Sequence, residues 1–244
     1  MELLIAIDAC KRASAQTINA IIPYYGYARQ DRKAAPRQPI TAKLVSSLLE
    51  RAGADRVVTI DLHARQIQGF FDVPADDIAA NALIGDYFNN KEGLGEVVVV
   101  SPDHGGAVRA RKLAEVLHAP IAIIDKRRPK PNVAVAMNLI GDVKDKNVVL
   151  IDDIVDTAGT ITKAANIMVE AGAKSVRAIA SHCVMSDPAS FRVQESALTE
   201  MVFTDSIPYS KKCDKVKQLS IADMFAETIK RVMNNESISS QYII

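Results

Sequence analysis

The sequence predicts an α/β fold in which parallel strands alternate with helices. Short apolar runs, such as residues 97–100 and 148–151, are typical of strands that a parallel sheet buries on both faces. Each of these runs is followed by a polar turn that contains glycine and then by apolar residues at helical spacing, over 107–114 and 161–169. A strand, a turn and a helix in this order form the repeating unit of α/β proteins.

The composition limits the classes of protein to which the chain can belong. Its 244 residues, 48% of them hydrophobic, suffice for one large domain or for two of ordinary size. The 30 Lys and Arg residues and the 29 Asp and Glu residues leave a net charge of +1, which gives no indication of bulk attraction to nucleic acid or to an anionic membrane. The apolar runs are far shorter than the roughly 18 residues that a membrane helix needs.

The cysteines and the first residues favour a reducing cytoplasm. Cys10, Cys183 and Cys213 are odd in number and show no CxxC spacing, which argues against a disulfide framework and against a zinc site. The chain starts with an acidic residue at position 2 and only a short apolar run, unlike a secretory signal.

The first part of the chain contains a loop that could meet a nucleotide. We expect, in order, a helix over 1–14, a strand over 18–24, a helix over 41–51 that ends at Gly53, and a strand over 56–62. The loop after the first strand carries tyrosines together with Arg29, Arg32 and Lys33. Its cations could pair with phosphates and its tyrosines could stack on a base. The alternative is a solvated loop whose aromatic side chains pack inward.

Two polar residues lie just after predicted strands. His63 comes after the strand over 56–62, and Asp103 comes after the strand over 96–100. Ligands bind at the carboxyl ends of strands in open α/β sheets, so both residues are candidates for a site. A single histidine is nevertheless more often structural than functional.

The second part of the chain is expected to begin after a boundary at residues 72–74. We predict helices over 77–88, from 107 and over 221–233, and strands over 96–100, 120–124 and 201–204. The segment 125–131 combines clustered cations with two prolines. It could be a targeting tract, a solvated loop or a mobile basic flap over a phosphate site.

Residues 147–162 are the most informative stretch, because they combine a buried strand, an acidic loop and the start of a helix. Thr157, Gly159 and Thr160 lie where the chain must turn into that helix. Unpaired backbone N–H groups and the positive end of the helix dipole form an anion site there, and Gly159 permits close approach of a phosphate.

The acidic residues of this stretch suggest what carries the phosphate. Asp152 and Asp153 cannot hold a phosphate themselves, because like charges repel. They could accept hydrogen bonds from sugar hydroxyls or lie near a hydrated Mg²⁺. A phosphate site beside two carboxylates therefore indicates a phosphorylated sugar as the ligand. The alternative is an acidic loop that only caps the helix.

Taken together, five stretches of this chain resemble ribose-phosphate pyrophosphokinases, the synthases of 5-phosphoribosyl 1-diphosphate. They occur in the order of the family, at residues 24–33, 61–64, 101–106, 125–128 and 152–160. The last stretch alone would also fit a phosphoribosyltransferase, because both groups share that loop. The loop over 24–33 and the basic residues 126–128 separate the two.

The resemblance implies two tandem doubly wound parallel-sheet domains of phosphoribosyltransferase type. The first would cover residues 1–74, with a closing helix over 219–233, and the second would cover residues 75–218. Members of the family carry an additional N-terminal segment before the helix that here begins at Met1. We therefore expect the first domain, on the ATP side, to be incomplete.

The resemblance also implies a reaction and a role for individual residues. The diphosphoryl group of Mg-ATP would pass to the C1 hydroxyl of ribose 5-phosphate, with AMP as the second product, for nucleotide biosynthesis. The residues implied are Lys126 and Arg128 in catalysis, Arg29, Gln30 and Asp31 at ATP, His63 and Asp103 at Mg²⁺, and Arg128, Asp152, Asp153, Asp156, Thr157, Ala158, Gly159 and Thr160 at ribose 5-phosphate.

The resemblance further implies a cytoplasmic homo-oligomer, a hexamer built from dimers, whose partners are ATP and ribose 5-phosphate and include neither nucleic acid nor a membrane. Two alternatives stay open. The chain could be a non-catalytic regulatory or partner subunit of such a synthase. It could also be a nucleobase phosphoribosyltransferase, which would need no ATP and would leave the basic flap without a purpose.

Overall fold

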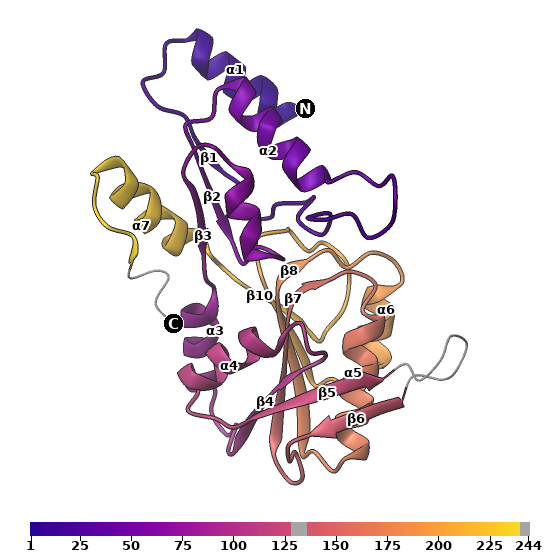
Figure 1. The fold of residues 1–244 in the computed structure, drawn as a ribbon. Coiled ribbons are helices and arrows are strands. Elements are labelled where there is room, and N and C mark those ends of the chain that lie inside the picture. The colour runs from indigo at the N-terminus through magenta and orange to yellow at the C-terminus, as the bar shows by residue number, and fades with distance from the viewer. Residues whose placement is uncertain (128–135, 240–244) are drawn as a thin grey trace. The chain divides into compact units, whose positions relative to one another are not determined.

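The computed structural model describes residues 1–127 and 136–239, most of which fall into two compact units, Met1–Ala79 and Ala80–Ile238 (Figure 1). Each unit contains a sheet whose neighbouring strands are parallel, with one antiparallel exception, so the predicted α/β class is confirmed. None of the helices in these ranges is long and apolar enough to cross a membrane.

The first unit is built on a three-stranded parallel sheet in the order β1-β2-β3. Its core joins residues from both long helices and from the sheet, among them Ile7, Leu49 and Val57. The second helix ends at Gly53, as predicted, where φ is 120° and a β-carbon would be strained. The elements are α1 (Glu2–Arg12), β1 (Asn19–Ile21), α2 (Thr41–Ala52), β2 (Arg56–Ile60), the 3₁₀ helix η1 (Arg65–Phe70) and β3 (Ala75–Ile78).

The helix predicted over 77–88 begins later than expected. Ala75–Ile78 form β3 instead, which pairs in parallel with β2, and the helix α3 covers Asn81–Asn89. This segment forms the third strand in the sheet of the first unit. Its hydrogen bonds with β2 outweigh the helical spacing of its apolar residues. The two units consequently divide after Ala79, a short way beyond the expected boundary.

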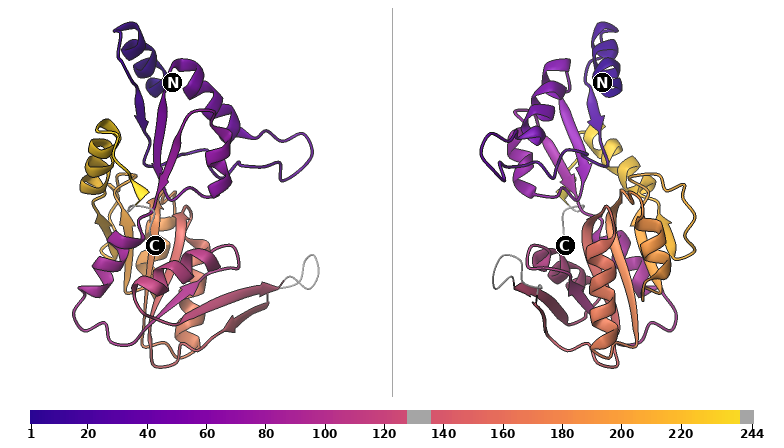
Figure 2. Two further views of the ribbon diagram at one scale, coloured as in Figure 1. Left: turned by 60° about the vertical axis from the view of Figure 1, so that its left-hand side comes forward. Right: turned by 90° about the vertical axis from the view of Figure 1, so that its right-hand side faces the viewer.

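The second unit is built on a seven-stranded sheet in the order β10-β9-β8-β7-β4-β5-β6, in which only β5 and β6 pair in antiparallel fashion. Helix α4 contacts β4 and β5, whereas α5 contacts β7 and β8. Figures 1 and 2 show α3 and α4 on one face of the sheet and α5 and α6 on the other, as in a doubly wound fold. The elements after α3 are β4 (Val97–Ser101), α4 (Ala107–Val116), β5 (Ile121–Arg127), β6 (Ala136–Ile140), β7 (Asn147–Val155), α5 (Gly159–Glu170), β8 (Ser175–Cys183), α6 (Ala189–Glu195), β9 (Glu200–Thr204), β10 (Val216–Leu219) and α7 (Ala222–Met233).

The central strand β7 explains why the apolar runs of the sequence are continuous. Val148, Val149 and Leu150 are completely buried, although their side chains point alternately to opposite faces of the sheet. A strand that is covered by helices on both faces needs apolar residues at every position. The same holds for Val98, Val99 and Val100 on β4, the neighbour of β7.

Three elements of the second unit, β6, α6 and β10, were not predicted. β6 and β10 are the edge strands of the sheet, and the two middle residues of β10, Lys217 and Gln218, are exposed. An edge strand lacks the continuous apolar run of a central strand, so its sequence carries a weak signal. Helix α7, which was expected to close the first domain, is counted with the second unit.

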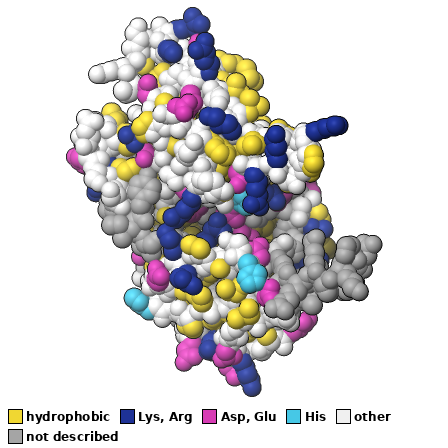
Figure 3. All heavy atoms as spheres, in the orientation of Figure 1, with side chains coloured by type: hydrophobic (Ala, Val, Ile, Leu, Met, Phe, Trp, Pro, Cys, Tyr) yellow, Lys and Arg dark blue, Asp and Glu magenta, His cyan; other side chains and the backbone are white. Residues whose placement is uncertain are grey.

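Figure 3 draws one face of the molecule, on which Lys and Arg side chains lie among Asp and Glu side chains. This mixed pattern agrees with the net charge of +1.

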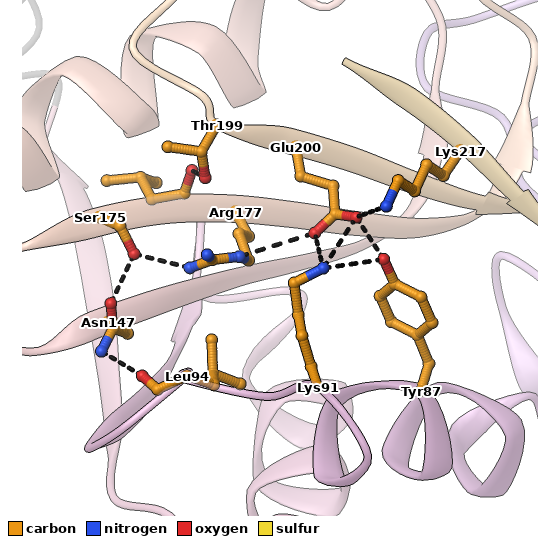
Figure 4. Close-up of polar contacts among 10 residues, drawn as sticks. Tyr87, Lys91, Leu94, Asn147, Ser175, Arg177, Thr199, Glu200 and Lys217 are labelled. Atoms are coloured by element: carbon orange, nitrogen blue, oxygen red, sulfur yellow. Dashed lines mark hydrogen bonds and ion pairs between the residues drawn. The ribbon is translucent and has the colours of Figure 1, made fainter. Parts of the chain in front are cut away.

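A buried network of polar side chains ties α3 to strands β8, β9 and β10 (Figure 4). Glu200 on β9 is 5% exposed, and its carboxylate lies 2.9 Å from Lys91 Nζ and 3.1 Å from Lys217 Nζ. Tyr87 also donates a hydrogen bond to this carboxylate, and Arg177 Nε lies 3.6 Å from it. Burial alone would raise the pKa of Glu200, but the hydrogen bonds from Tyr87, Lys91 and Lys217 outweigh it and hold the pKa below its ordinary value.

Replacing Glu200 with glutamine should lower the free energy of unfolding by about 3 kcal/mol, because half-buried cations would lose their only shared counter-charge in this network. Urea denaturation followed by circular dichroism measures the change. The folded-state pKa lies below the ordinary value of 4.5, so the difference from the native chain should be complete above pH 4.5 and shrink as the pH falls through the lowered pKa.

The matched control is Lys217→Met, since the side chain of Lys217 is 57% exposed and its pair with Glu200 is screened by water. This change should cost roughly 1 kcal/mol or less. Equal stability of the Glu200→Gln variant and the native chain would show that the network does not stabilise the fold.

Candidate functional site

One edge of the sheet in the second unit collects the residues that the sequence singled out there. β4, β5 and β7 are parallel neighbours, so their carboxyl ends lie at the same edge. Asp103 follows β4, Lys126 lies near the end of β5, and residues 152–160 form the end of β7 and the start of α5. The fold therefore brings these three segments to one edge, as the strand-end rule predicted.

The turn over residues 157–160, which we call the phosphate loop, has the backbone of an anion site. Ala158 is buried and adopts a left-handed conformation with φ of 60°, which turns the chain sharply from β7 into α5. No side chain caps the start of α5, so the first N–H groups of this helix are not satisfied by a side-chain cap. Thr157 and Thr160 are exposed. Together with the helix dipole, this geometry suits a phosphate.

Arg192 on α6 is a residue of this loop that sequence reasoning missed. Its Nη1 donates a 2.8 Å hydrogen bond to the carbonyl oxygen of Thr157 and would lie 3.7 Å from a β-carbon added at Gly159. The contact holds one side of the phosphate loop and adds positive charge beside it. Only the packing of α6 against α5 brings this distant part of the chain to the loop.

Asp152 and Asp153, which we call the carboxylate pair, lie within β7. The sequence had predicted that they would lie in the loop after this strand, so that prediction was wrong. β8 continues to pair with β7 as far as Val155, so the strand extends past both residues. Asp153 is buried, and its backbone N–H donates a 2.9 Å hydrogen bond to Asp152 Oδ1. The rigid strand therefore fixes the carboxylate pair relative to the phosphate loop.

The guanidinium of Arg109 on α4 faces the carboxylate pair. Its Nη1 lies 3.4 Å from Asp153 Oδ1 and 3.8 Å from Asp152 Oδ1. Burial and the neighbouring Asp153 carboxylate raise the pKa of Asp152 to about 7, while Arg109 opposes this rise. Carboxylates beside a phosphate loop can accept hydrogen bonds from the hydroxyls of a sugar whose phosphate sits in the loop.

His104 and Asp125 form a second contact that sequence reasoning missed. His104 Nε2 lies 2.7 Å from Asp125 Oδ1, and Asp125 is buried at the end of β5. The pair links the loop after β4 to the strand that leads into the basic segment. The position of His104 directly after a strand-end carboxylate was the signal that could have found it.

The basic flap lies partly outside the described residues. The backbone of Lys126 belongs to β5 and pairs with Met137 on β6, so the basic segment begins within an antiparallel pair of strands. The side chain of Lys126 and all of Arg128 lie outside the described residues, and their roles remain predictions.

The residues expected to contact ATP follow β1 in the first unit. Arg29 and Gln30 are exposed, and the carbonyl oxygen of Gln30 accepts a 3.2 Å hydrogen bond from the backbone N–H of Ala42. Asp31 Oδ2 accepts a 2.9 Å hydrogen bond from Gln66. The loop is thus anchored to α2 and η1, and its role at ATP remains a prediction.

One of the tyrosines in this loop cannot stack on a base. Tyr25 is buried, donates a 2.8 Å hydrogen bond to the carbonyl oxygen of Ala42, and packs edge-on against Phe71 with 5.8 Å between ring centroids. Burial and the charge of Glu50 raise its pKa above the ordinary range of tyrosine. Tyr27 is exposed and stays available. For Tyr25 the inward-packing alternative is therefore the correct one.

The predicted magnesium residues belong to different units. His63 is exposed after β2 in the first unit, and Asp103 follows β4 in the second. Asp103 Oδ1 accepts a 3.0 Å hydrogen bond from the backbone N–H of Gly106. In the ranges 1–127 and 136–239, no three His, Cys, Asp or Glu side chains converge as a metal site. Asp103 by itself is a single carboxylate donor, which suits a magnesium ion that takes most of its ligands from nucleotide phosphates and water.

Comparisons with known proteins identify the family of this chain. A family model described as the N-terminal domain of ribose phosphate pyrophosphokinase matches residues 1–53, and one described as the phosphoribosyl synthetase-associated domain matches residues 126–243. The ribose-phosphate pyrophosphokinase of Bacillus cereus is 61% identical over 241 residues, which are 98% of this chain and 76% of that protein. The ribose-phosphate pyrophosphokinase of Bacillus subtilis is 59% identical over the same shares.

A solved structure is similar to this chain over nearly its full length. The phosphoribosylpyrophosphate synthetase from Mycobacterium smegmatis matches with a TM-score of 0.90 and 45% sequence identity, over 96% of this chain and 78% of that one.

Proposed function

The chain belongs to the family of ribose-phosphate pyrophosphokinases, and we therefore propose that it transfers the diphosphoryl group of Mg-ATP to the C1 hydroxyl of ribose 5-phosphate. The products are 5-phosphoribosyl 1-diphosphate and AMP. The observation that carries the proposal is the phosphate loop directly beside the carboxylate pair at one edge of the sheet. This arrangement suits a ligand with a phosphate at one end and hydroxyls a few bonds away.

Ribose 5-phosphate binds across this edge of the second unit. The backbone N–H groups of the phosphate loop, from Thr157 to Thr160, hold the 5-phosphate, and Arg128 adds a positive charge. Asp152, Asp153 and Asp156 accept hydrogen bonds from the ribose hydroxyls. The sugar is then held at both ends, so its C1 hydroxyl has a defined direction.

ATP binds at the residues that follow the strand ends of the first unit. Arg29, Gln30 and Asp31 contact the nucleotide, and His63 in the first unit and Asp103 in the second are each residues that would help to hold Mg²⁺. When bound, Mg²⁺ neutralises charge on the phosphates and makes the β-phosphorus more electrophilic.

The chemistry is one displacement at the β-phosphorus. The C1 hydroxyl oxygen forms a bond to that phosphorus, the bond from the phosphorus to the oxygen shared with the α-phosphate breaks, and AMP leaves with this oxygen. The hydroxyl proton passes to water, since no residue is assigned as a base. Lys126 and Arg128 place positive charge where negative charge increases during the transfer.

Such an enzyme serves nucleotide biosynthesis in the cytoplasm. We propose further that it acts as a homo-oligomer, a hexamer built from dimers, with small-molecule ligands and with neither nucleic acid nor a membrane as partner. The support is the level of similarity to enzymes of this family, at 59% to 61% identity in two of them.

The test is to mix the purified chain with ATP, Mg²⁺ and ribose 5-phosphate and to measure AMP by chromatography. We expect AMP and 5-phosphoribosyl 1-diphosphate in equal amounts, and no AMP when ribose replaces ribose 5-phosphate, because the phosphate loop is then empty. Absence of AMP would contradict the proposal. Co-purification with an active homologue would then favour a partner subunit, and consumption of phosphoribosyl diphosphate with a nucleobase and without ATP would favour a phosphoribosyltransferase.

A further inference from the structure

Arg109 on α4 is a basic residue whose guanidinium faces the carboxylate pair on β7. It lies near the start of α4, on the helix that covers β4 and β5, and its side chain is 22% exposed. Its Nη1 is within 4 Å of both carboxylates, at 3.4 Å and 3.8 Å. Sequence reasoning gave it no role, because it stands in an amphipathic helix and not in a motif.

We propose that Arg109 is a positioning residue that favours the ionised form of the carboxylate pair, in which both carboxylates accept hydrogen bonds from the ribose hydroxyls. The inference rests on the proposed binding of ribose 5-phosphate to this edge. According to this proposal, a residue on α4 affects the protonation of the ligand-contacting carboxylates on β7.

The physical reason is the repulsion between the two carboxylates. The side chains of Asp152 and Asp153 are 24% and 8% exposed. Without a cation, two such carboxylates on adjacent residues of one strand would tend to share a proton, because partial burial and like charge both favour the neutral form. A protonated carboxyl carries a donor and loses part of its capacity to accept hydrogen bonds. The guanidinium of Arg109 is permanently charged and can face both oxygens, so it counters this protonation.

Other titratable groups stand on elements next to the carboxylate pair. They are Asp103 in the loop after β4, His182 on β8, whose Nδ1 lies 2.9 Å from Ser206 Oγ, and Asp156 directly after β7. Arg109 Nη1 lies within 4 Å of both carboxylates, and its positive charge lowers the pKa of Asp152.

The effect should be visible as a shifted pH dependence of binding. The pKa of Asp152 is about 7 with Arg109 in place. If removal of Arg109 raises this pKa by about one unit, the ionised fraction at pH 7 falls about fivefold, whereas near pH 9 it changes by only about a tenth. A role that is only structural would lower affinity equally at every pH.

The experiment is calorimetric titration of the full chain with ribose 5-phosphate, without nucleotide, from about pH 6 to about pH 9. Arg109→Gln should bind about fivefold more weakly at pH 7 and approach native affinity near pH 9. Arg109→Lys retains the positive charge and should keep the native pH profile. Arg111→Gln, an exposed arginine of the same helix, is the matched control and should match the native chain.

The outcomes separate the inference from the proposed function. If the native chain binds no ribose 5-phosphate at any pH, the proposed function fails. If the native chain binds but Arg109→Gln shows an unshifted profile, or a loss that is equal at every pH, the inference is wrong. If the Gln variant does not fold, the Lys variant decides, since a folded Lys variant with an upward-shifted profile contradicts a role that depends on charge.

Discussion

Replacing Lys126 with alanine should lower the turnover number about a thousandfold, while the dissociation constants of ribose 5-phosphate and Mg-ATP stay nearly unchanged. The positive charge acts mainly when negative charge increases on the transferring group and on the leaving oxygen. Ground-state complexes lack that additional charge, so they gain little from the lysine. Single-turnover measurement of AMP release gives the rate, and calorimetry gives the two dissociation constants.

The position of Lys126 in the fold supports this expectation. Its backbone pairs with Met137 near the end of β5, and β5 runs parallel to β4, so the residue lies at the edge that carries the phosphate loop. Lys174→Ala is the matched control, because this exposed lysine precedes β8 and lies at the opposite edge of the sheet. A loss in ribose 5-phosphate affinity as large as the loss in turnover would assign Lys126 to substrate binding instead.

Replacing Asp152 with asparagine should weaken ribose 5-phosphate binding about 10- to 100-fold, because a hydrogen bond to a charged group contributes about 1.5 to 3 kcal/mol. The amide has nearly the same shape but presents one acceptor and one donor where the ionised carboxylate presents two acceptors. Calorimetric titration with ribose 5-phosphate measures the loss. Unchanged affinity would contradict the assignment of Asp152 to the ribose hydroxyls.

The pH dependence gives a second measure of Asp152. Its pKa is raised to about 7, so the binding-competent ionised form increases as the pH rises through 7. Native affinity should increase over that range, whereas affinity of the Asp152→Asn variant should lack this increase. Asp142→Asn is the control: this carboxylate has an exposed side chain, pairs with Lys146 ahead of β7, and should behave as the native chain does.

Parts of the candidate site that rest on local sequence could be predicted. The phosphate loop follows from an apolar strand, a turn with Gly159 and an apolar helical repeat, all within a short stretch. Asp103 was identified because it lies just after such a strand. Arg109, Arg192 and the His104 and Asp125 pair follow from contacts between segments far apart in the chain, which no local pattern reports.

The sequence by itself determined the α/β class, the buried central strands and the residues at the strand ends. Each of these depends on the spacing of apolar and polar residues within a short segment of the chain. Only the tertiary structure decided that residues 75–78 form a strand, that Tyr25 packs into the core, and that Asp152 and Asp153 lie within β7 facing a cation from α4. Those outcomes depend on which distant part of the chain packs against each segment. Strand pairing and burial then outweigh the conformational preference of the local sequence.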